Sequence, residues 1–270
     1  MANEMIHAID CHAHVIDHTR PITSHRHTQP LRSHTAEELL SLFDENGVSQ
    51  GLLTAPSFYL TDNSLLLDTL AAHTRFRGTA NFPPDIGVNE LESFQRAGIC
   101  GARLNWFKKP ELPDISSYSN MFSRLREVGL HLELYVEGKL LPQLLPSILS
   151  SGVNLVLDHF GSPDPVDGVD SDGFKMMLDA MNAEQAWVKL SAPYRLQGEN
   201  FESLAREYAQ ALLQNSGPER LVWASDWPWT QNEGGMSYQR CLNWLSDWIP
   251  DDAHRMKILC DTPRALFGFL

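Results

Sequence analysis

The sequence alternates short apolar runs with segments of helical periodicity, and it does so eight times. Each apolar run, from residues 6–15 to residues 220–228, has a length typical of a strand. Most are followed by a segment with helical spacing, such as 89–98, 118–129 or 201–217, and several of these segments end in glycine. Alternating strands and helices predict parallel pairing through crossover helices, and eight such units close naturally into a (β/α)₈ TIM barrel.

An open, doubly wound sheet is the alternative architecture for the same order of elements. Its dinucleotide-binding form is disfavoured, because no GxGxxG follows the first strand. The 270 residues contain no linker rich in Pro, Gly or Ser, no internal repeat and no low-complexity tract. We therefore predict a single barrel domain over residues 1–270, a size common for this fold.

Charge and cysteine content restrict the expected partners and compartment. The formal net charge of −13 argues against nucleic acid or an anionic membrane as partner, because both would repel such a surface. The four cysteines form no CxxC pair, the sequence begins without a signal-like segment, and no run approaches the roughly 20 apolar residues of a membrane span. We expect a reduced, cytoplasmic protein, and its oligomeric state stays open.

The first strand carries an acid and two histidines at alternate positions, Asp10, His12 and His14. Alternation predicts that all three lie on one face and that Cys11 faces the helices. Two neutral imidazoles, with a carboxylate from a distant strand, can bind a metal ion, although a histidine can equally be a hydrogen-bonded core residue. Asp10 lies deeper, where it can either hydrogen-bond a histidine ring or make a simple buried hydrogen bond.

Two later strands end in residues of the same kind. His159 follows the sixth strand in phase with its two leucines, and Asp226 ends the eighth strand in phase with Val222 and Ala224. Barrel enzymes place their chemistry at the C-terminal ends of the strands. We therefore expect His12, His14, His159 and Asp226 to meet at the mouth of the barrel.

Polar residues also interrupt the strand interiors. If the apolar residues of strands four, five and seven face the helices, the alternate positions face the barrel axis. Buried cations there need anionic partners. Two explanations stay open: internal pairs, such as Lys189 with Asp226 or Glu133 with Arg103, or an anionic ligand. The inward-facing set is Arg103, Tyr135, Lys189 and Arg195.

The segment after the first strand, residues 17–34, is basic in an acidic protein. It contains four histidines and three arginines against the single acid Asp17. Its position predicts a cover for the barrel mouth and its charge suits an anionic substrate, although a solvated polar loop explains it equally well. Lys108 and Lys109, after the fourth strand, add positive charge at the same end.

The motifs at the strand ends resemble those of the amidohydrolase superfamily, and within it the branch of 2-pyrone-4,6-dicarboxylate hydrolase and related lactonases. The motifs are "DCHAHV", "GARLNW", "LVLDHFG", "WVKLSAPYR" and "LVWASDWP", and "TPRALFGF" is similar to the C-terminal helix of that branch. The resemblance covers essentially the whole chain. It implies a distorted (β/α)₈ barrel that hydrolyses a small lactone.

The sequence departs from the family's two-metal pattern. Binuclear members carry a lysine at the end of strand four and a histidine at the end of strand five, where this chain reads "RLNW" and "LYVEG". A binuclear centre is therefore not expected. The branch that the chain resembles works without a metal, which favours a site with no metal. The remaining ligands can still bind one zinc or manganese ion through His12, His14 and Asp226, with or without His159, so both possibilities stay open.

In the lactonase interpretation, Asp226 is the general base that activates water for attack on the ring carbonyl. His12, His14 and His159, or a metal that they help to hold, stabilise the oxyanion. A small anionic lactone or carboxylate is the expected substrate. The expected substrate-binding residues are Arg103, Arg195, Tyr135, Lys108 and Ser191.

Three other functions remain to be weighed against lactone hydrolysis. A metal-dependent decarboxylase of the amidohydrolase type and a sugar-acid lactone isomerase use the same scaffold. A non-catalytic ligand-binding barrel is disfavoured, because three histidines beside Asp226 at the mouth have no packing purpose. Metal analysis and a panel of lactones discriminate among these functions.

Overall fold

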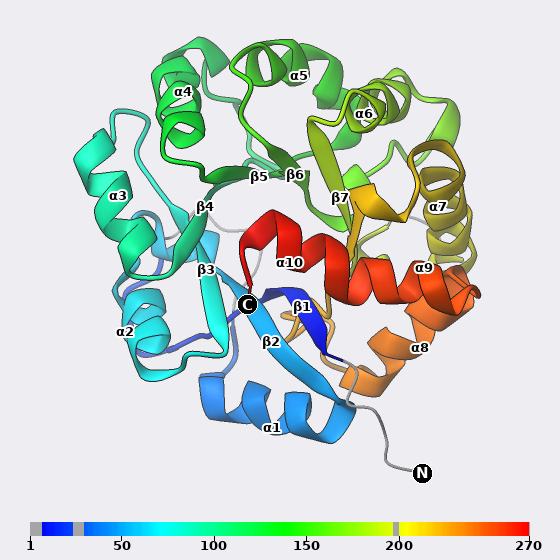
Figure 1. Ribbon diagram of the computed structural model, residues 1–270, viewed down its shortest axis with the longest axis horizontal. Helices are drawn as coiled ribbons and strands as arrows, with labels where there is room; N and C mark the ends of the chain where they lie inside the picture. Colours follow the sequence, from blue (N-terminus) through cyan, green and yellow to red (C-terminus); the bar gives the residue numbers. More distant parts are fainter. Residues whose placement is uncertain (1–6, 24–29, 197–199, 270) are drawn as a thin grey trace.

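The computed structural model describes residues 7–23, 30–196 and 200–269, and its centre is one sheet of eight parallel strands in the order β1 to β8. The strands lie inside a ring of helices (Figure 1). The predicted (β/α)₈ barrel is confirmed. The strands are β1 (Ala8–Ala13), β2 (Val48–Thr54), β3 (Phe76–Asn81), β4 (Ile99–Asn105), β5 (His131–Tyr135), β6 (Leu155–Leu157), β7 (Ala186–Leu190) and β8 (Leu221–Trp223).

The barrel closes between β1 and the segment that follows β8. The backbone N–H of Asp226 donates to the carbonyl of His12 at 2.9 Å, and the N–H of His14 donates to the carbonyl of Trp227 at 2.9 Å. Ala13 and Trp227 form an isolated parallel bridge between these two bonds. The backbone bonds that close the barrel therefore also bring His12, His14 and Asp226 together.

The helices form where apolar spacing and caps coincide. In α1, Leu39 and Phe43 lie one turn apart and are fully buried, while Thr35 and Glu38 form a capping box at its N-terminus. Gly47 ends this helix with a left-handed φ of 71°. The helices are α1 (Ala36–Asn46), α2 (Ser64–Ala72), α3 (Val88–Arg96), α4 (Ser119–Glu127), α5 (Leu141–Ser150), α6 (Asp172–Asn182), α7 (Phe201–Ser216), α8 (Tyr238–Trp248), α9 (Asp252–Met256) and α10 (Thr262–Phe267).

The lower half of the barrel interior, toward the N-terminal ends of the strands, is mostly apolar, and it also contains the buried ring of His131. Helix α10 lies across this end (Figure 1). Phe267 and Phe269 of the C-terminal segment pack against a buried cluster formed by inward residues of five strands. Those residues are Ile9, Cys11, Leu52, Cys100, Val156, Val222 and Ala224. The prediction that Cys11 faces the helices is wrong, because this thiol belongs to the interior cluster.

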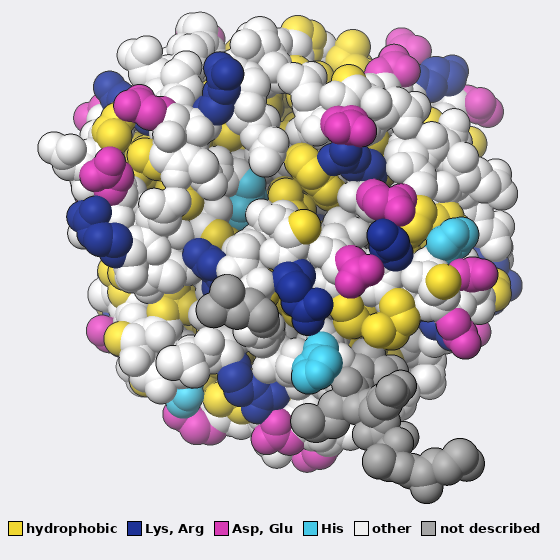
Figure 2. Space-filling view, viewed as in Figure 1, with side chains coloured by type: hydrophobic (Ala, Val, Ile, Leu, Met, Phe, Trp, Pro, Cys, Tyr) yellow, Lys and Arg dark blue, Asp and Glu magenta, His cyan; other side chains and the backbone are white. Residues whose placement is uncertain are grey.

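The outer surface at the α10 end is mixed in charge. Lys and Arg side chains alternate with Asp and Glu over this face (Figure 2). In the described ranges, no helix has both the length and the apolar character needed to cross a membrane.

Candidate active site

An irregularity in β1 decides where its polar side chains point. Asp10 is paired with Gly51 of β2, but the next partners are Ala13 and Leu53, so three steps along β1 match two along β2. One extra residue in a strand reverses the faces of the side chains that follow it. His12 therefore turns into the barrel, although Asp10 does not.

Asp10 faces α8 on the outer side of the barrel wall. Its carboxylate accepts hydrogen bonds from the backbone N–H and hydroxyl of Ser225, at 3.0 and 2.5 Å, and from the hydroxyl of Tyr238 at 2.8 Å. It also accepts from the backbone N–H of His12 at 3.2 Å. The prediction of a shared face is therefore wrong for Asp10, and the alternative of a buried hydrogen-bond role describes its contacts.

Three imidazoles and one carboxylate oxygen converge at the mouth. The Nε2 atoms of His12 and His14 are 3.2 Å apart. Asp226 Oδ1 lies 3.6 Å from His12 Nε2, and it lies 3.8 Å from the Nε2 atoms of both His14 and His159. His14, His159 and Asp226 line a pocket that opens at this end, and His12 lies fully buried beneath it. The expected meeting of these four side chains at the barrel mouth is confirmed.

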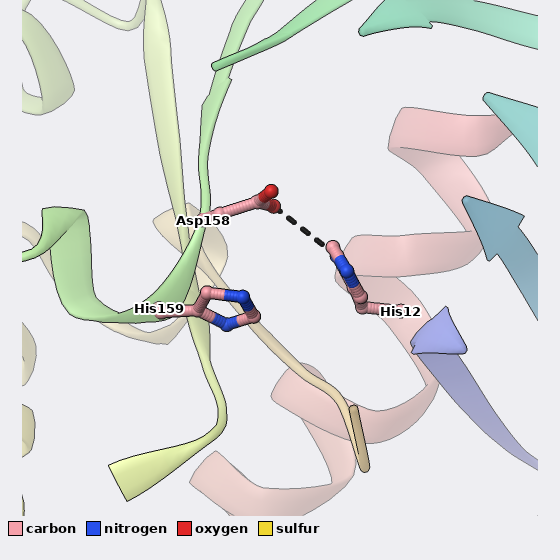
Figure 3. A group of neighbouring side chains, drawn as sticks. All are labelled: His12, Asp158 and His159. Carbon is pink, nitrogen blue, oxygen red and sulfur yellow. Dashed lines mark ion pairs between the residues drawn. The ribbon is translucent and has the colours of Figure 1, made fainter. Parts of the chain in front are cut away.

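His159 reaches the mouth by a turn rather than by strand alternation. Leu155 and Leu157 pack outward in the main core, and the inward positions are Val156 and Asp158, so the predicted phase is wrong. His159 has a left-handed φ of 49° in the turn after β6, which redirects its ring. Figure 3 shows the result, with Asp158 and His159 both beside His12.

The two carboxylate oxygens of Asp226 have different surroundings, because Oδ2 accepts hydrogen bonds and Oδ1 faces the imidazoles. Its Oδ2 accepts from the hydroxyl of Tyr194 at 2.6 Å and from Arg195 Nε at 2.9 Å, with Arg195 Nη2 at 2.8 Å. Within the described residues, Oδ1 is buried and accepts no hydrogen bond. Burial opposes ionisation, but the positive charge of the Arg195 guanidinium favours the carboxylate, and the pKa of Asp226 lies below its usual value. The side chain is therefore a carboxylate at neutral pH.

The histidines at the mouth are neutral. Burial lowers the pKa of His14 to about 3 and the pKa of His159 to about 4, and it brings the pKa of His12 well below its usual value. His14 Nδ1 is 2.6 Å from the carbonyl oxygen of Thr54, which can only accept, so Nδ1 carries the proton and Nε2 presents a lone pair. His159 Nδ1 is 2.8 Å from the hydroxyl of Ser191.

A fully paired charge cluster lies beneath the histidines. Lys189 is completely buried, and its Nζ lies 2.5 Å from Glu133 Oε2 and 3.2 Å from Asp158 Oδ1. Arg103 lies across the same two acids, with Nε 3.1 Å from Glu133 and Nη2 3.3 Å from Asp158. The internal pair of Arg103 with Glu133 is confirmed. Lys189, however, pairs with Glu133 and Asp158, where Asp226 was the expected partner.

The donor set fits one divalent cation. His12, His14 and Asp226 offer ligand atoms that all lie within 4.8 Å of one another. A second group, His12, Asp158 and His159, meets the same criterion (Figure 3). The decisive feature is Asp226 Oδ1, a buried carboxylate oxygen without a hydrogen bond that faces imidazole nitrogens, because nitrogen and oxygen donors of this kind bind zinc and similar ions.

Comparison with known proteins connects this site to a family. A protein-family profile described as amidohydrolase matches residues 9–269. The chain belongs to the amidohydrolase family. The resemblance inferred from the strand-end motifs is therefore confirmed.

Relatives of this amidohydrolase match it along nearly its whole length. It is 28% identical to 4-sulfomuconolactone hydrolase of Hydrogenophaga intermedia, over 96% of this chain and 88% of that protein. It is also 28% identical to 2-pyrone-4,6-dicarboxylate hydrolase of Comamonas testosteroni, over 96% and 90% of the two chains. A crystal structure from Pseudomonas putida, provisionally assigned as a 2-pyrone-4,6-dicarboxylic acid hydrolase, is 34% identical, with a TM-score of 0.90 and 98% of each chain covered.

The expected substrate-binding residues of this amidohydrolase occupy three different places. Arg103, Tyr135 and Arg195 line the pocket that also contains His14. Lys108 is exposed and lines an adjacent groove, with its Nζ 5.4 Å from the centre of the Phe107 ring. Ser191 is buried behind His159 and contacts the pocket through that ring.

The basic segment 17–34 is only partly described. His25, Arg26 and His27 lie outside the described residues. Arg32 lies 2.8 Å from Glu38, and Arg20 lies 3.6 Å from Asp17, so these two arginines are paired with nearby acids. The apolar side chain of Ile16, which directly precedes this segment, lines the pocket.

Sequence reasoning missed two residues of the site, Asp158 and Tyr194. Asp158 stands two residues after the inward-facing Val156, and alternation from that residue would have found it. The buried cations of the neighbouring strands also required an acid at this level. Tyr194 directly precedes Arg195 in a short 3-10 turn that brings both side chains to Asp226, and no periodic pattern indicates such a turn.

Proposed function

We propose that this amidohydrolase hydrolyses a small lactone that carries one or more carboxylates. The observation that supports this most is Asp226: an ionised, buried carboxylate whose Oδ1 faces the pocket without a hydrogen bond, beside neutral imidazoles and Arg195. The relatives add support, since two of them are named as hydrolases of anionic lactones.

Asp226 is the general base in this proposal. A water molecule in the pocket gives its proton to Oδ1 as its oxygen attacks the ring carbonyl. The ring C–O bond then breaks, and the proton passes from Asp226 to the departing ring oxygen. Tyr194 and Arg195 hold Oδ2, so the carboxylate keeps one orientation while Oδ1 gains and loses the proton.

Arg195 is the main residue of the pocket that binds a substrate carboxylate in this proposal. It lines the pocket, and the acid it contacts is Asp226, whereas Arg103 is occupied by Glu133, Asp158 and the carbonyl of Ala55. A guanidinium offers five donors, so Arg195 can contact Asp226 and a substrate carboxylate together. Tyr135 lies at the same pocket, and Lys108 is placed to meet a second anionic group from the adjacent groove.

We further propose that the site holds one divalent ion, zinc or manganese. His12, His14, His159 and Asp226 would hold it, and a bound ion polarises a carbonyl as a Lewis acid. The charge balance supports this. The three cationic side chains of the site balance its three carboxylates. A dianionic substrate therefore adds negative charge that has no partner in the site, and one divalent ion would offset it. The cations are Arg103, Lys189 and Arg195, and the carboxylates are Glu133, Asp158 and Asp226.

The test is acid release from a panel of lactones. We expect release from 2-pyrone-4,6-dicarboxylate or a muconolactone, and little from an uncharged lactone of the same ring size. Each is assayed with protein stripped by a chelator, then with added zinc or manganese. The absence of acid release under all conditions would overturn the proposal. Carbon dioxide from an aromatic acid would instead indicate a decarboxylase, and an isomerised lactone without acid would indicate an isomerase.

A further inference from the structure

Two grooves adjoin the catalytic pocket. The groove that contains Lys108 and Lys109, called the lysine groove from here on, meets the pocket at Arg103. The second groove has a volume of about 260 Å³ and meets the pocket at His159 and Arg195. In the proposed function, an anionic group of the substrate occupies the lysine groove, whereas the second groove has no occupant.

The second groove lies between the segments that follow β5, β6 and β7, and we call it the β5–β7 groove. Its walls are residues 137–139, 162–166 and 195–196, with Phe107 and His159. The backbone N–H of Gly138 donates to the carbonyl of Ser162 at 2.7 Å, which joins the first two segments. An added Cβ on Gly138 would lie 2.6 Å from that carbonyl oxygen, so the two backbones are in close contact. The groove is therefore part of the folded framework.

Beyond Arg195, the charges of the β5–β7 groove disfavour an anion. Glu137 and Asp164 are its acids and Lys139 is its remaining cation, because Arg195 is paired with Asp226. Outside the charge cluster, the lysine groove has the reverse balance, with two lysines and one acid. A substrate carboxylate is therefore attracted to the lysine groove and repelled from the β5–β7 groove.

Apolar side chains supply most of the remaining wall of the β5–β7 groove. They are Pro163, Pro165, Val166 and Leu196, together with the ring of Phe107. Val166 is exposed at the rim, and Leu196 is partly buried against the main core. Hydrocarbon placed against these side chains removes apolar surface from water on both partners, which is favourable. The composition of the groove therefore suits a hydrocarbon group.

Phe107 stands between the two grooves and lines both of them. Its ring is stacked on Tyr135, which lines the catalytic pocket, with ring centres 4.4 Å apart and planes inclined by 8°. Such a stacked pair is more stable than its buried area alone accounts for, so Phe107 is held in place. A cyclic substrate at the mouth therefore presents different substituents to the two grooves.

We propose that the β5–β7 groove binds an uncharged hydrocarbon substituent of the substrate. This inference rests on the proposed function and narrows its substrate class. The carboxylates of the lactone lie toward Arg195 and the lysine groove, and an alkyl or aryl group lies toward Val166 and Leu196. A carboxylate in that second position would lose its hydration and face Glu137 and Asp164.

A hydrocarbon group in this groove also excludes water from the chemistry. His159 lines both the groove and the pocket, and its Nε2 lies 3.8 Å from Asp226 Oδ1. The group replaces water beside these two side chains, and interactions between charges strengthen where water is excluded. We therefore expect an alkyl substituent to raise kcat/KM as well as binding affinity.

The first experiment measures the binding of ligands that cannot be hydrolysed. Isophthalate, a planar ring with two carboxylates, is compared with derivatives that carry a propyl group or a third carboxylate at the fifth ring position. By calorimetry on the wild-type protein, we expect the propyl group to tighten binding by roughly fourfold for each carbon that becomes buried. We expect the third carboxylate to weaken binding. No gain from the propyl group, or a gain from the third carboxylate, would overturn the proposal.

A matched pair of leucine variants locates the propyl group. Leu196 lines the β5–β7 groove, whereas Leu60 lines the lysine groove and is exposed. We expect Leu196→Ser to remove most of the gain from the propyl group and Leu60→Ser to leave that gain unchanged. Any other pattern, such as equal losses in both variants, would contradict this assignment. If Leu196→Ser fails to fold, nuclear Overhauser contacts between the propyl group and the Leu196 methyl groups of the wild-type protein decide the question.

Hydrolysis assays separate this inference from the proposed function. On carboxylated lactones, kcat/KM should rise with an alkyl substituent and fall with a further carboxylate at the same ring position. Hydrolysis that is indifferent to the alkyl group would leave the proposed function standing and refute the assignment of the β5–β7 groove. Tighter binding of the propyl compound without hydrolysis of any lactone would support the groove and refute the proposed function.

Discussion

The two halves of the barrel interior are built from the same strands with opposite chemistry. On β6, Val156 packs in the lower half, and two residues later Asp158 joins a cluster of ions. On β8 and its continuation, Val222 packs in the lower half and Asp226 faces the imidazoles at the mouth. A step of two residues, or about 6.6 Å along a strand, separates the two environments on β6.

The energetic roles of the two halves differ accordingly. Apolar side chains in the lower half stabilise the fold, since each fully buried large side chain contributes roughly 1.5–3 kcal/mol. Buried ion pairs add little net stability, because removing two charges from water offsets most of their attraction. The upper half therefore serves the chemistry of the mouth, and the lower half holds the strands that position it.

Asp226→Asn should give the largest effect, and it tests the upper half. The amide keeps the shape of the side chain but cannot accept a proton, so turnover should fall about 10²- to 10⁴-fold, as expected for loss of a general base. The measurement is kcat on a carboxylated lactone, with the urea midpoint as the check on folding. A variant within threefold of wild type would remove Asp226 from the mechanism.

Phe267→Ala tests the lower half. This ring is buried where α10 meets the barrel, and it lies 5.0 Å from the His131 ring, centre to centre. A buried Phe→Ala substitution typically costs about 3–5 kcal/mol. We expect a loss of that size in the free energy of unfolding, with kcat per folded molecule unchanged. A comparable fall in kcat would show that the two halves are not separable.

Acid should destabilise both halves, because each contains a buried neutral histidine. Burial lowers the pKa of His131, in the lower half, to about 3. It lowers the pKa of His159, in the upper half, to about 4. In the unfolded protein the two imidazoles take up protons near pH 6.5, whereas in the folded protein they remain neutral at that pH. Proton uptake therefore favours unfolding: the free energy of unfolding has its full value above pH 6.5 and decreases as the pH falls. For His159 the loss by pH 4 is about 3 kcal/mol.

The measurement is the urea midpoint from pH 7 to pH 4 in the presence of a chelator. His131→Leu provides the control for the lower half, because it removes one proton-binding group that the catalytic proposal does not use. We expect a shallower pH dependence in this variant and unchanged kcat at pH 7. An unaltered slope would mean that His131 does not contribute to acid sensitivity.

The smallest expected effect separates the two arginines that line the pocket. Arg195→Met should raise KM for a carboxylated lactone relative to a neutral one, because a charge-assisted hydrogen bond contributes roughly 1.5–3 kcal/mol. Arg103 is bound to Glu133 and Asp158, so Arg103→Met should lower stability and affect both substrates alike. The ratio of the two KM values is the measurement. A charge-selective effect confined to Arg103→Met would reverse this assignment.

Periodicity predicted the strands well, and it predicted the directions of side chains only where the strands are regular. The inward positions of Arg103, Glu133 and Lys189 follow from the alternation of β4, β5 and β7. The alternation failed for Asp10, because β1 contains an extra residue before Ala13. It also failed for His159, whose left-handed φ redirects the ring after β6 ends.

By itself, the sequence determined the barrel, the family and the polar composition of the mouth. These follow from local patterns: short apolar runs, helical spacing and chemically distinctive residues at strand ends. Only the tertiary structure decided which groups pair. Asp158 of β6 joins Lys189 of β7 and His12 of β1, and Arg195 takes one oxygen of Asp226 and leaves the other to the imidazoles. Such partners come from strands far apart in the chain, and their distances depend on barrel closure and on backbone turns that no sequence period records.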